Sequence, residues 1–589
     1  MKIPIQNTWR QENDGEIFGS LNSSFNLDLF TDRGRLKISP RFMYTTSVNE
    51  QTDLLTPVAF KRVSLVSNEK WYIISGSAVT GDAVSVKIYV GGPEPDDVFI
   101  PDTATGTPDL STSSTPDLET FAATNGDLRL YAAAGALDRQ DANGADWDTV
   151  TSLSSSGGAP LIKFAGRLYY KYDYRSMGSI DDAETAVNPS GTPNTNSFAL
   201  RLLSGLVITC GRANSSFIWL GTLAEKGQLA KVIKWNGETT NPAASYEIPA
   251  QSILAMTIKD DQPWIIDSQG EIWGFNGGTF VKKARLPFQY LKKLISPLGD
   301  ATLKLVHYNG MITKDNGDIL ILVNATYADG TSDPLVPSGL WIYNDQNGLY
   351  HAGSMSKWKY GTTTTAIDYG YLVIDEVGAL GIAESYDSTS DGRIMAGAKI
   401  ATTMAAVFID NADNNKQKAG WFTTPWIYST EVKDNFNKTF SRSKEFGAVG
   451  DKFVLKYRTE KVAPALIDAT WVSSESFTTV TDISAKEGYE VQVLTGIGAG
   501  KTAHITDVYF SDGVYNATVD ETFSGATGSA TMRLENWTKS STYDGTDDNW
   551  EFNLDSTKTK IQLKMSIIVT GDWYLHDLNL ANTSNQPAK

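Results

Sequence analysis

The sequence predicts an all-β protein that is divided into several domains. Short runs rich in Val, Ile, Tyr, Phe and Trp recur along the chain, and clusters of Gly, Asn, Asp and Ser separate them. This pattern is typical of short strands joined by tight turns, and helical periodicity is nearly absent. The 589 residues, of which 41% are hydrophobic, are too many for one hydrophobic core, so we expect more than one domain.

Residues 1–50 are expected to form an N-terminal arm. Within them, residues 18–29 alternate apolar and polar side chains, and the basic segment 32–38 follows closely. We expect the arm to lie on a partner or on the body of the protein.

Residues 51–415 carry recurring phrases that each predict a strand, a turn containing Gly or Asn-Gly, and a second strand. Gly suits such turns because it adopts positive φ without steric cost. The phrases lie at residues 163–170, 234–237, 264–273, 307–311 and 338–343. Their spacing of about 40 to 60 residues is that of a four-stranded blade, which predicts a β-propeller of about six or seven blades. The alternative is a large β-sandwich or barrel.

The strand pattern lengthens towards the C-terminus. Residues 416–467 and 538–589 are predicted to form a C-terminal β-sandwich, with long strands near residues 420–428 and 561–569. Residues 468–537 contain a set of short strands of their own. We expect them to form a small inserted β-domain, because exposed loops tolerate insertions of whole domains.

The charge and composition of the chain restrict the kinds of partner that it can bind. The net charge is −17, from 51 Lys and Arg against 68 Asp and Glu, which disfavours a sequence-independent grip on nucleic acid phosphates. No run approaches the roughly 18 apolar residues that span a bilayer. The first seven residues also turn polar before a signal-peptide core could form, so we expect no membrane insertion and synthesis in the cytosol.

Several motifs could carry chemistry, but each has a simpler explanation. Residues 495–502 end like a phosphate-binding loop, yet position 495 is Thr and a strand at 503–510 follows instead of a helix. Residues 387–392 resemble the start of a calcium loop, but Ala398 stands where a bidentate Glu is required. The clusters 410–415 and 543–548 are explained by Asx turns.

No catalytic group can be nominated from spacing. Residues 267–273 only faintly resemble the Asp-box turn of sialidases, and the four histidines, His307, His351, His504 and His576, are far apart in sequence. The single cysteine, Cys210, excludes an intramolecular disulfide and is predicted to be a buried strand residue. We therefore assign no catalytic residue, no cofactor-binding residue and no metal ligand, and we expect no enzyme activity.

Aromatic residues are dense in the last third of the chain. They are Trp421, Trp426, Tyr428, Trp537, Trp550 and Trp573. Carbohydrate-binding modules use such side chains, but sandwich cores and subunit interfaces use them as readily. We expect a core or interface role, with sugar binding as the alternative.

The order of the phrases resembles that of structural proteins of tailed bacteriophages. The resemblance rests on residues 19–29 with 34–41, 264–270 with 275–280, 307–311, and 488–496 with 520–525. These segments sample most of the chain, and none of them is a catalytic signature.

The resemblance implies a virion component. Propeller-bearing subunits of short-tailed phages form a nozzle, a ring around the DNA channel, so we expect a homo-oligomeric ring that contacts other virion tail proteins. Phage DNA would be only a passing, non-specific contact, and assembly would occur in the bacterial cytoplasm. The alternatives are a receptor- or glycan-binding tail fibre or adhesin, and a propeller glycosidase.

Overall fold

The computed structural model describes the part of the chain that contains its regular elements. The described residues are 2–4, 23–25, 27–28, 36–38, 42–44, 57–64, 69–75, 87–91, 100–104, 106, 115–122, 128–133, 135–140, 146–181, 194–225, 227–286, 306–314, 316–323, 339–346, 348–353, 376–383, 393–400, 403–409, 419–428, 435–443, 451–460, 462, 464–493, 502–523, 525–544, 549–554, 560–569 and 573–583. Within these ranges every regular element is a β-strand, which confirms the all-β prediction.

Six four-stranded antiparallel sheets follow one another along the chain, each made of four consecutive strands. The first three contain β6 (Pro57–Ser64), β7 (Glu69–Ser75), β8 (Lys87–Gly91), β9 (Ile100–Pro101), β10 (Asp117–Ala122), β11 (Leu128–Ala133), β12 (Ala136–Gln140), β13 (Trp147–Ser152), β14 (Gly158–Phe164), β15 (Arg167–Lys171), β16 (Ser176–Asp181) and β17 (Asn194–Arg201). The next three contain β18 (Leu206–Ala213), β19 (Ile218–Ala224), β20 (Ala230–Trp235), β21 (Ala244–Ile248), β22 (Ile253–Lys259), β23 (Gln262–Asp267), β24 (Glu271–Phe275), β25 (Phe280–Arg285), β26 (Met311–Thr313), β27 (Ile319–Val323), β28 (Gly339–Asn344) and β29 (Gly348–Gly353).

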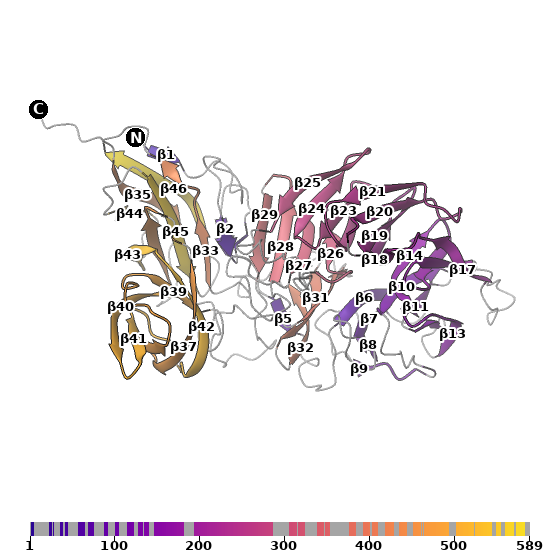
Figure 1. The fold of residues 1–589 in the computed structure, drawn as a ribbon, viewed down its shortest axis with the longest axis horizontal. Helices are drawn as coiled ribbons and strands as arrows, with labels where there is room; N and C mark the ends of the chain where they lie inside the picture. Colours follow the sequence, from indigo (N-terminus) through magenta and orange to yellow (C-terminus); the bar gives the residue numbers. More distant parts are fainter. Residues whose placement is uncertain are drawn as a thin grey trace, which may run out of the picture.

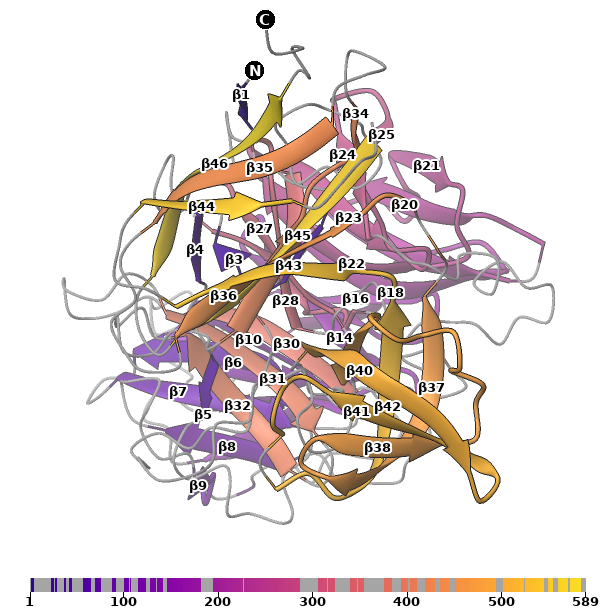
Figure 2. The same ribbon diagram turned by 90° about the vertical axis from the view of Figure 1, so that its left-hand side faces the viewer.

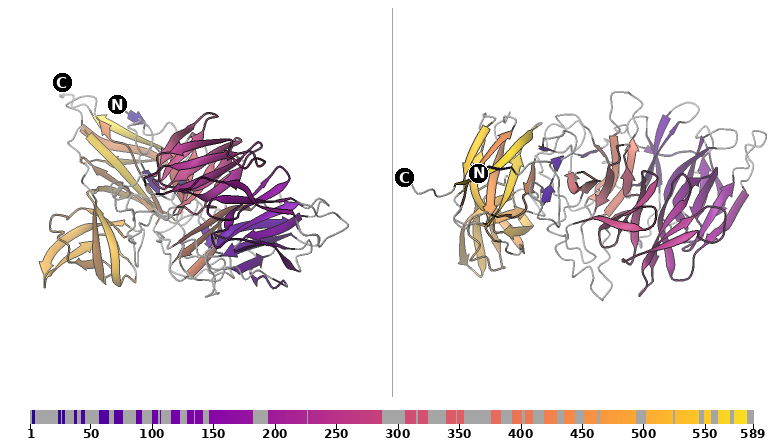
Figure 3. Two further views of the ribbon diagram at one scale, coloured as in Figure 1. Left: turned by 45° about the vertical axis from the view of Figure 1, so that its right-hand side comes forward. Right: turned by 90° about the horizontal axis from the view of Figure 1, so that it is seen from above.

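A seventh four-stranded sheet joins the two ends of this series. It contains β30 (Glu376–Ala383), β31 (Arg393–Ile400), β32 (Thr403–Ile409) and, from the N-terminal segment, β5 (Phe42–Tyr44). The first strand of each sheet contacts the first strand of the next, and β30 contacts β6. The sheets therefore form a closed ring, which makes this part of the chain a β-propeller (Figures 1 and 3).

Aromatic side chains fill the spaces between neighbouring sheets. Trp235 on β20 is fully buried and stands edge-on to Tyr169 on β15 of the preceding sheet, with ring centroids 5.2 Å apart. Trp219 packs on Phe275 of the following sheet at 5.0 Å. Each of these aromatic side chains buries a large apolar area. Apolar packing between neighbouring sheets therefore holds the propeller together.

The hairpin phrases of the sequence are partly confirmed. Ala165 and Gly166, both at positive φ, form the two-residue turn that joins β14 to β15, as residues 163–170 predicted. Residues 307–311 are different. Val306 and His307 lie outside any strand, and residues 308–310 form a turn that leads into β26, so this phrase is not a hairpin.

Two six-stranded sheets follow the ring, and strands of the N-terminal segment belong to both. One sheet contains β1 (Lys2–Pro4), β3 (Leu27–Asp28), β4 (Leu36–Ile38), β35 (Asn435–Ser443), β44 (Asn549–Asn553) and β46 (Tyr574–Thr583). The other contains β2 (Ser23–Phe25), β33 (Ala419–Thr423), β34 (Ile427–Tyr428), β36 (Lys452–Arg458), β43 (Thr538–Tyr543) and β45 (Lys560–Ile568). Strands β2 and β3 also contact β29 of the ring, so these two strands lie between the ring and the six-stranded sheets (Figure 1).

A closed six-stranded barrel lies between β36 and β43 in the sequence. Its strands are β37 (Ala465–Ser473), β38 (Ser476–Thr479), β39 (Glu490–Val493), β40 (Thr502–Ser511), β41 (Val514–Val519) and β42 (Gly528–Glu535). Its interior is apolar, and Trp471 packs against Phe523 there at 4.7 Å. Since β36 and β43 pair with each other in one sheet, both ends of the barrel segment start from that sheet (Figure 2). The described residues contain no helix long and apolar enough to cross a membrane.

Candidate functional site

A buried polar cluster lies at the centre of the ring. We call Asp117, Lys171, Arg212, His307 and Asn309 the central cluster. Asp117 begins β10, Lys171 ends β15, Arg212 is near the end of β18, and the two others precede β26. Asp117, Lys171, His307 and Asn309 are each at most 6% exposed, so their polar atoms must be paired within the protein or carry a desolvation cost.

Hydrogen bonds of the central cluster cross the ring. The amide of Asn309 donates to Asp117 Oδ1 at 2.9 Å and accepts from Arg212 Nη2 at 2.9 Å. The other carboxylate oxygen of Asp117 accepts the backbone N–H of Leu161 at 2.9 Å. The sheets that carry Asp117 and Asn309 are not neighbours in the ring. The turn that holds Asn309 therefore occupies the centre and ties opposite sheets together.

Tyr308 strengthens this closure. Its hydroxyl donates to the carbonyl of Pro116, and its ring lies 3.7 Å from that of His307. Lys171 Nζ in turn donates to Thr115 Oγ1 at 3.2 Å. These two contacts join the segment in front of β10 to the turn that holds Asn309 and to β15.

Burial controls the charges of the central cluster. Burial raises the pKa of Asp117, although the N–H of Leu161 and the charge of Arg212 oppose it. Burial lowers the pKa of Lys171 to about 8, and burial together with Arg212 lowers the pKa of His307 to about 3. His307 is therefore neutral near pH 7, and its backbone-facing Nδ1 accepts the N–H of Asn309 at 3.1 Å. The side chains of the central cluster are buried or partly buried, and hydrogen bonds among them cross the propeller, as expected of residues that hold its sheets together. We call such an arrangement a clamp.

A second buried cluster joins the barrel to the sheet beneath it. We call Lys456, Lys564, Glu490, Glu535 and Arg458 the junction cluster. Lys456 Nζ lies 2.6 Å from Glu490 Oε2, and Lys564 Nζ binds the other oxygen of the same carboxylate. The side chains of Lys456, Lys564 and Glu490 are at most 2% exposed. The lysines come from β36 and β45, whereas Glu490 comes from the barrel.

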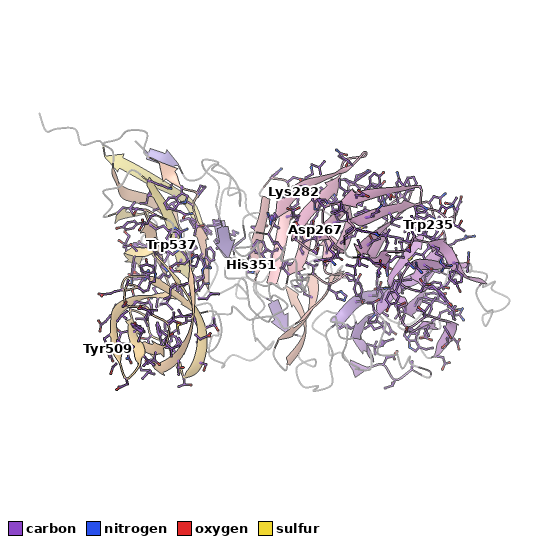
Figure 4. The ribbon with its side chains drawn as sticks, viewed as in Figure 1. Trp235, Asp267, Lys282, His351, Tyr509 and Trp537 are labelled. Carbon is purple, nitrogen blue, oxygen red and sulfur yellow. The ribbon has the colours of Figure 1, made fainter. Side chains whose placement is uncertain are left out.

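Further contacts extend the junction cluster. Glu535 accepts from Trp537 Nε1 at 3.0 Å, and the Arg458 guanidinium lies 4.1 Å above the Trp537 ring. Arg458 Nε donates to Gln562 Oε1 at 2.8 Å. Burial alone would raise the pKa of Glu490, but the ammonium groups of Lys456 and Lys564 hold it well below its usual range. The barrel is therefore fixed to the sheet by charged groups that are almost fully buried, and the buried Trp537 packs among them (Figure 4).

The junction predicts that the barrel loses stability in acid. Burial lowers the pKa of His504 below its ordinary 6.5 despite the nearby Asp520 carboxylate. A group with a depressed folded-state pKa stabilises the fold above its unfolded pKa and loses that contribution as the pH falls. The loss should begin near pH 6.5 for His504 and continue below pH 4.5 as Glu490 is protonated in the unfolded chain.

Hydrogen exchange followed by mass spectrometry checks this prediction. Peptides from residues 465–535 should exchange progressively faster, relative to the intrinsic rate, as the pH is lowered from 7 to 4.5. The variant His504→Gln should remove the part of the change near pH 6.5. Protection of the barrel that stays constant over this range would contradict the prediction.

The faint Asp-box segment has a structural role. Asp267 is fully buried at the end of β23 (Figure 4). Its Oδ1 accepts the N–H groups of Gln269 at 2.8 Å and Glu271 at 3.0 Å, and its Oδ2 accepts Trp273 Nε1 at 2.9 Å. Burial raises its pKa to about 6 although these donors lower it. The carboxylate shapes the turn between β23 and β24.

The other residues that the sequence singled out are dispersed. Cys210 is a buried residue of β18, as expected, and burial raises its pKa to about 11. His351 on β29 is fully buried beside Trp341 of β28, while His504 lies on β40 of the barrel. The structure does not bring these histidines together. Within the described ranges no group of three or more His, Cys, Asp or Glu side chains could hold a metal ion.

Two of the C-terminal tryptophans are core residues. Trp537 and Trp573 are at most 2% exposed, so they cannot stack on a sugar. Trp421 and Trp426 are partly buried, and Lys564 and Lys560 lie over their rings at 4.9 Å and 4.2 Å. The side chains of Tyr428, Trp550 and His576 are outside the described set, as are residues 387–392, 410–415, 495–501 and 545–548.

The sequence analysis missed both clusters. A signal was present for the junction cluster, because Lys456 and Lys564 each stand within an apolar strand, in the runs 453–457 and 561–565. A lysine there is either solvent-facing or a buried ion-pair partner. No local signal marks Asp117 or Asn309, since their partners are distant in sequence.

A shallow groove lies on the outer face of the barrel. Its volume is about 450 Å³, and Thr and Ser side chains line it together with Ala, Val and one Asp. The lining includes Asp468, Thr470, Thr478, Val480, Ser529 and Thr531.

Comparisons with known proteins return similar folds only. No protein-family model matches the chain, and no curated protein matches it. A chain in the crystal structure of a mitotic checkpoint complex has 10% sequence identity to this chain. The match covers 64% of this chain and 92% of that one, with a TM-score of 0.37. The Swd1 beta-propeller domain of Myceliophteria thermophila is 10% identical over 63% and 100%, with a TM-score of 0.37. BamB of Moraxella catarrhalis is 12% identical over 63% and 98%, with a TM-score of 0.33. Similarities at this level carry no argument about function.

Proposed function

We propose that the chain is a structural component of a tailed-bacteriophage virion, a tail subunit that assembles into a nozzle- or hub-like ring around the DNA exit channel. The sequence phrases that resemble phage structural proteins support this role. The observation that carries it is the N-terminal segment, whose strands β1 to β4 join the C-terminal sheets while β5 completes the propeller. The chain is thereby tied into one body, as a subunit of a rigid conduit requires.

In this proposal each sheet of the ring is one blade, which gives seven blades. The two six-stranded sheets face each other as a β-sandwich, which the contact between Phe453 of one sheet and Trp573 beside β46 of the other supports at 6.4 Å. The barrel is the inserted β-domain. The domains are then the arm (1–50), the propeller (51–415), the sandwich (416–467 and 538–589) and the insertion (468–537).

The central cluster defines the path of the DNA in this proposal. Asp117, Asn309 and Tyr308 fill the centre of the propeller with paired polar groups. DNA therefore passes through the opening enclosed by several subunits. The net charge of −17 disfavours tight binding to phosphates, so DNA is a passing, non-specific contact. The role needs no catalysis and no cofactor, and the subunit is assembled in the host cytoplasm.

Mass spectrometry of phage particles tests this proposal. Particles purified by density gradient from cells that carry the gene should contain peptides of this chain at several copies per particle. A non-structural protein encoded in the same genome serves as the negative control. Particles in which other tail proteins are detected but this chain is absent would overturn the proposal.

The second candidate function is receptor or glycan binding, and the barrel groove favours it. The hydroxyls of Thr470, Thr478 and Ser529 and the carboxylate of Asp468 are groups that hydrogen-bond sugars. A glycan array probed with the whole chain and with the Asp468→Ala variant tests this role. Binding of a glycan by the whole chain that the Asp468→Ala variant loses would support the glycan-binding role. The absence of any binding on the array would contradict that role.

A further inference from the structure

The propeller exposes a group of apolar side chains beside two arginines. Tyr174, Phe198 and Leu203 are 61%, 49% and 81% exposed. Arg175 directly follows Tyr174 in the chain, and the Arg201 side chain lies near the Phe198 ring. We call these five residues the arginine patch. Large apolar side chains that gather on a surface mark interaction sites, and aromatic residues with arginine are enriched at interfaces.

Backbone hydrogen bonds hold the arginine patch together. The N–H of Leu202 donates to the carbonyl of Arg175 at 2.9 Å, and the N–H of Ile208 donates to that of Tyr174 at 2.8 Å. The Arg201 guanidinium lies 5.9 Å from the Phe198 ring centroid. Asp173, the nearest acidic residue in sequence, accepts the N–H groups of Arg175 and Ser176. The patch is therefore a preformed surface with a positive rim.

The barrel exposes a second group at the end of a hairpin. Tyr509 and Phe510 are 54% and 62% exposed on β40, and Phe510 packs on Tyr515 of β41 at 4.9 Å. The exposed carboxylates of Asp507 and Asp512 flank them. We call these five residues the acidic hairpin. Within the described residues, β40 beyond Ile505 pairs only with β41, and β41 pairs with β38 only from Tyr515 onward, so the end of the hairpin (511–514) extends beyond the neighbouring strands.

The two surfaces are complementary and lie at opposite ends of the molecule. Strand β17, which carries Phe198, is at one end of the long axis, and Tyr509 is at the other (Figures 1 and 4). One surface has arginines around apolar side chains, and the other has carboxylates around aromatic rings. A molecule with unlike, complementary surfaces at opposite ends makes head-to-tail contacts, which close into rings when the rotation between copies permits.

We propose that the acidic hairpin of one copy docks on the arginine patch of the next copy. This inference rests on the proposed function, because it supplies the contact that builds the ring. The aromatic rings bury against the patch, and the carboxylates of Asp507 and Asp512 pair with the guanidinium groups of Arg175 and Arg201. Each subunit thus binds one neighbouring copy through its acidic hairpin and the other neighbouring copy through its arginine patch.

Cross-linking between two single-cysteine variants tests this contact directly. The native Cys210 is only 1% exposed, so an introduced cysteine is the reactive one. The Leu203→Cys and Tyr509→Cys chains are mixed and treated with a short bis-maleimide. The mixture should give a cross-linked pair containing one copy of each variant, whereas each variant alone should stay uncross-linked. A Glu247→Cys chain, altered on the exposed outer strand β21, is the control partner and should not cross-link to either.

Each other outcome overturns the inference. Cross-linking of the Leu203→Cys chain to itself would mean that the patch meets its own copy, and a mixture without cross-links would mean that the two surfaces do not meet. As a second measurement, Phe198→Ser with Leu203→Ser should weaken self-association at least about tenfold, and unchanged association would contradict the contact. Presence of the chain in phage particles is measured separately, so the contact can fail while the proposed function stands.

Discussion

Replacing Glu490 with glutamine is expected to lower the free energy of unfolding of the barrel and its supporting sheet by about 3–5 kcal/mol. Glu490 binds Lys456 and Lys564 in a site that is almost fully closed to water. Removing its charge takes from two buried ammonium groups the carboxylate that they share, and the next carboxylate to Lys564, that of Glu535, is 3.9 Å away. Urea unfolding, with hydrogen exchange of residues 465–535 to locate the change, measures the loss.

Two comparisons make the Glu490 prediction specific. Glu521→Gln breaks a pair with Lys452 whose side chains are 22% and 30% exposed, and it should cost less than about 1 kcal/mol. The triple change of Glu490→Leu, Lys456→Met and Lys564→Met removes all three charges and should restore most of the lost stability. A Glu490→Gln chain as stable as the original would mean that the junction cluster does not hold the barrel.

Replacing Asp117 with alanine is expected to destabilise the centre of the propeller by about 3 kcal/mol. The change leaves the backbone N–H of Leu161 and the amide of Asn309 without their shared acceptor in a buried site. It also removes the negative charge that interacts with Lys171. The loss should appear as faster hydrogen exchange in residues 115–122 and 158–171, measured at constant pH.

The control for Asp117 is Glu247→Gln on the outer strand β21. Glu247 is 61% exposed and pairs with Lys231 at 3.1 Å, so its loss should change stability by less than about 1 kcal/mol. Equal protection of residues 115–122 in the Asp117→Ala and unaltered chains would show that the central cluster is not a clamp.

The sequence predicted what local patterns encode. Alternation and glycine turns indicated strands throughout. Gly166, for example, lies in a two-residue turn that requires its positive φ. The apolar neighbours of Cys210 indicated a buried strand position, which the structure confirms. These features depend on residues a few positions apart, so one sequence is sufficient to find them.

The long-range contacts could not be predicted in the same way. Met43 pairs with Phe408 across the closure of the ring, and Ile3 pairs with Leu580. Strand pairing uses backbone hydrogen bonds that any residue except proline can make, so the partner of a short edge strand is not encoded in its own pattern. The central cluster was missed for the same reason, because Asp117 and Asn309 meet only once the ring has formed.

Electron microscopy of the purified chain tests the central claim most directly. Negative-stain images, together with mass photometry of the same sample, report whether copies of the chain close into a ring. The account predicts closed rings of uniform copy number, with the opening between subunits and no opening through any one propeller. A uniform population of monomers at every concentration, or rings whose only openings lie within single propellers, would contradict it.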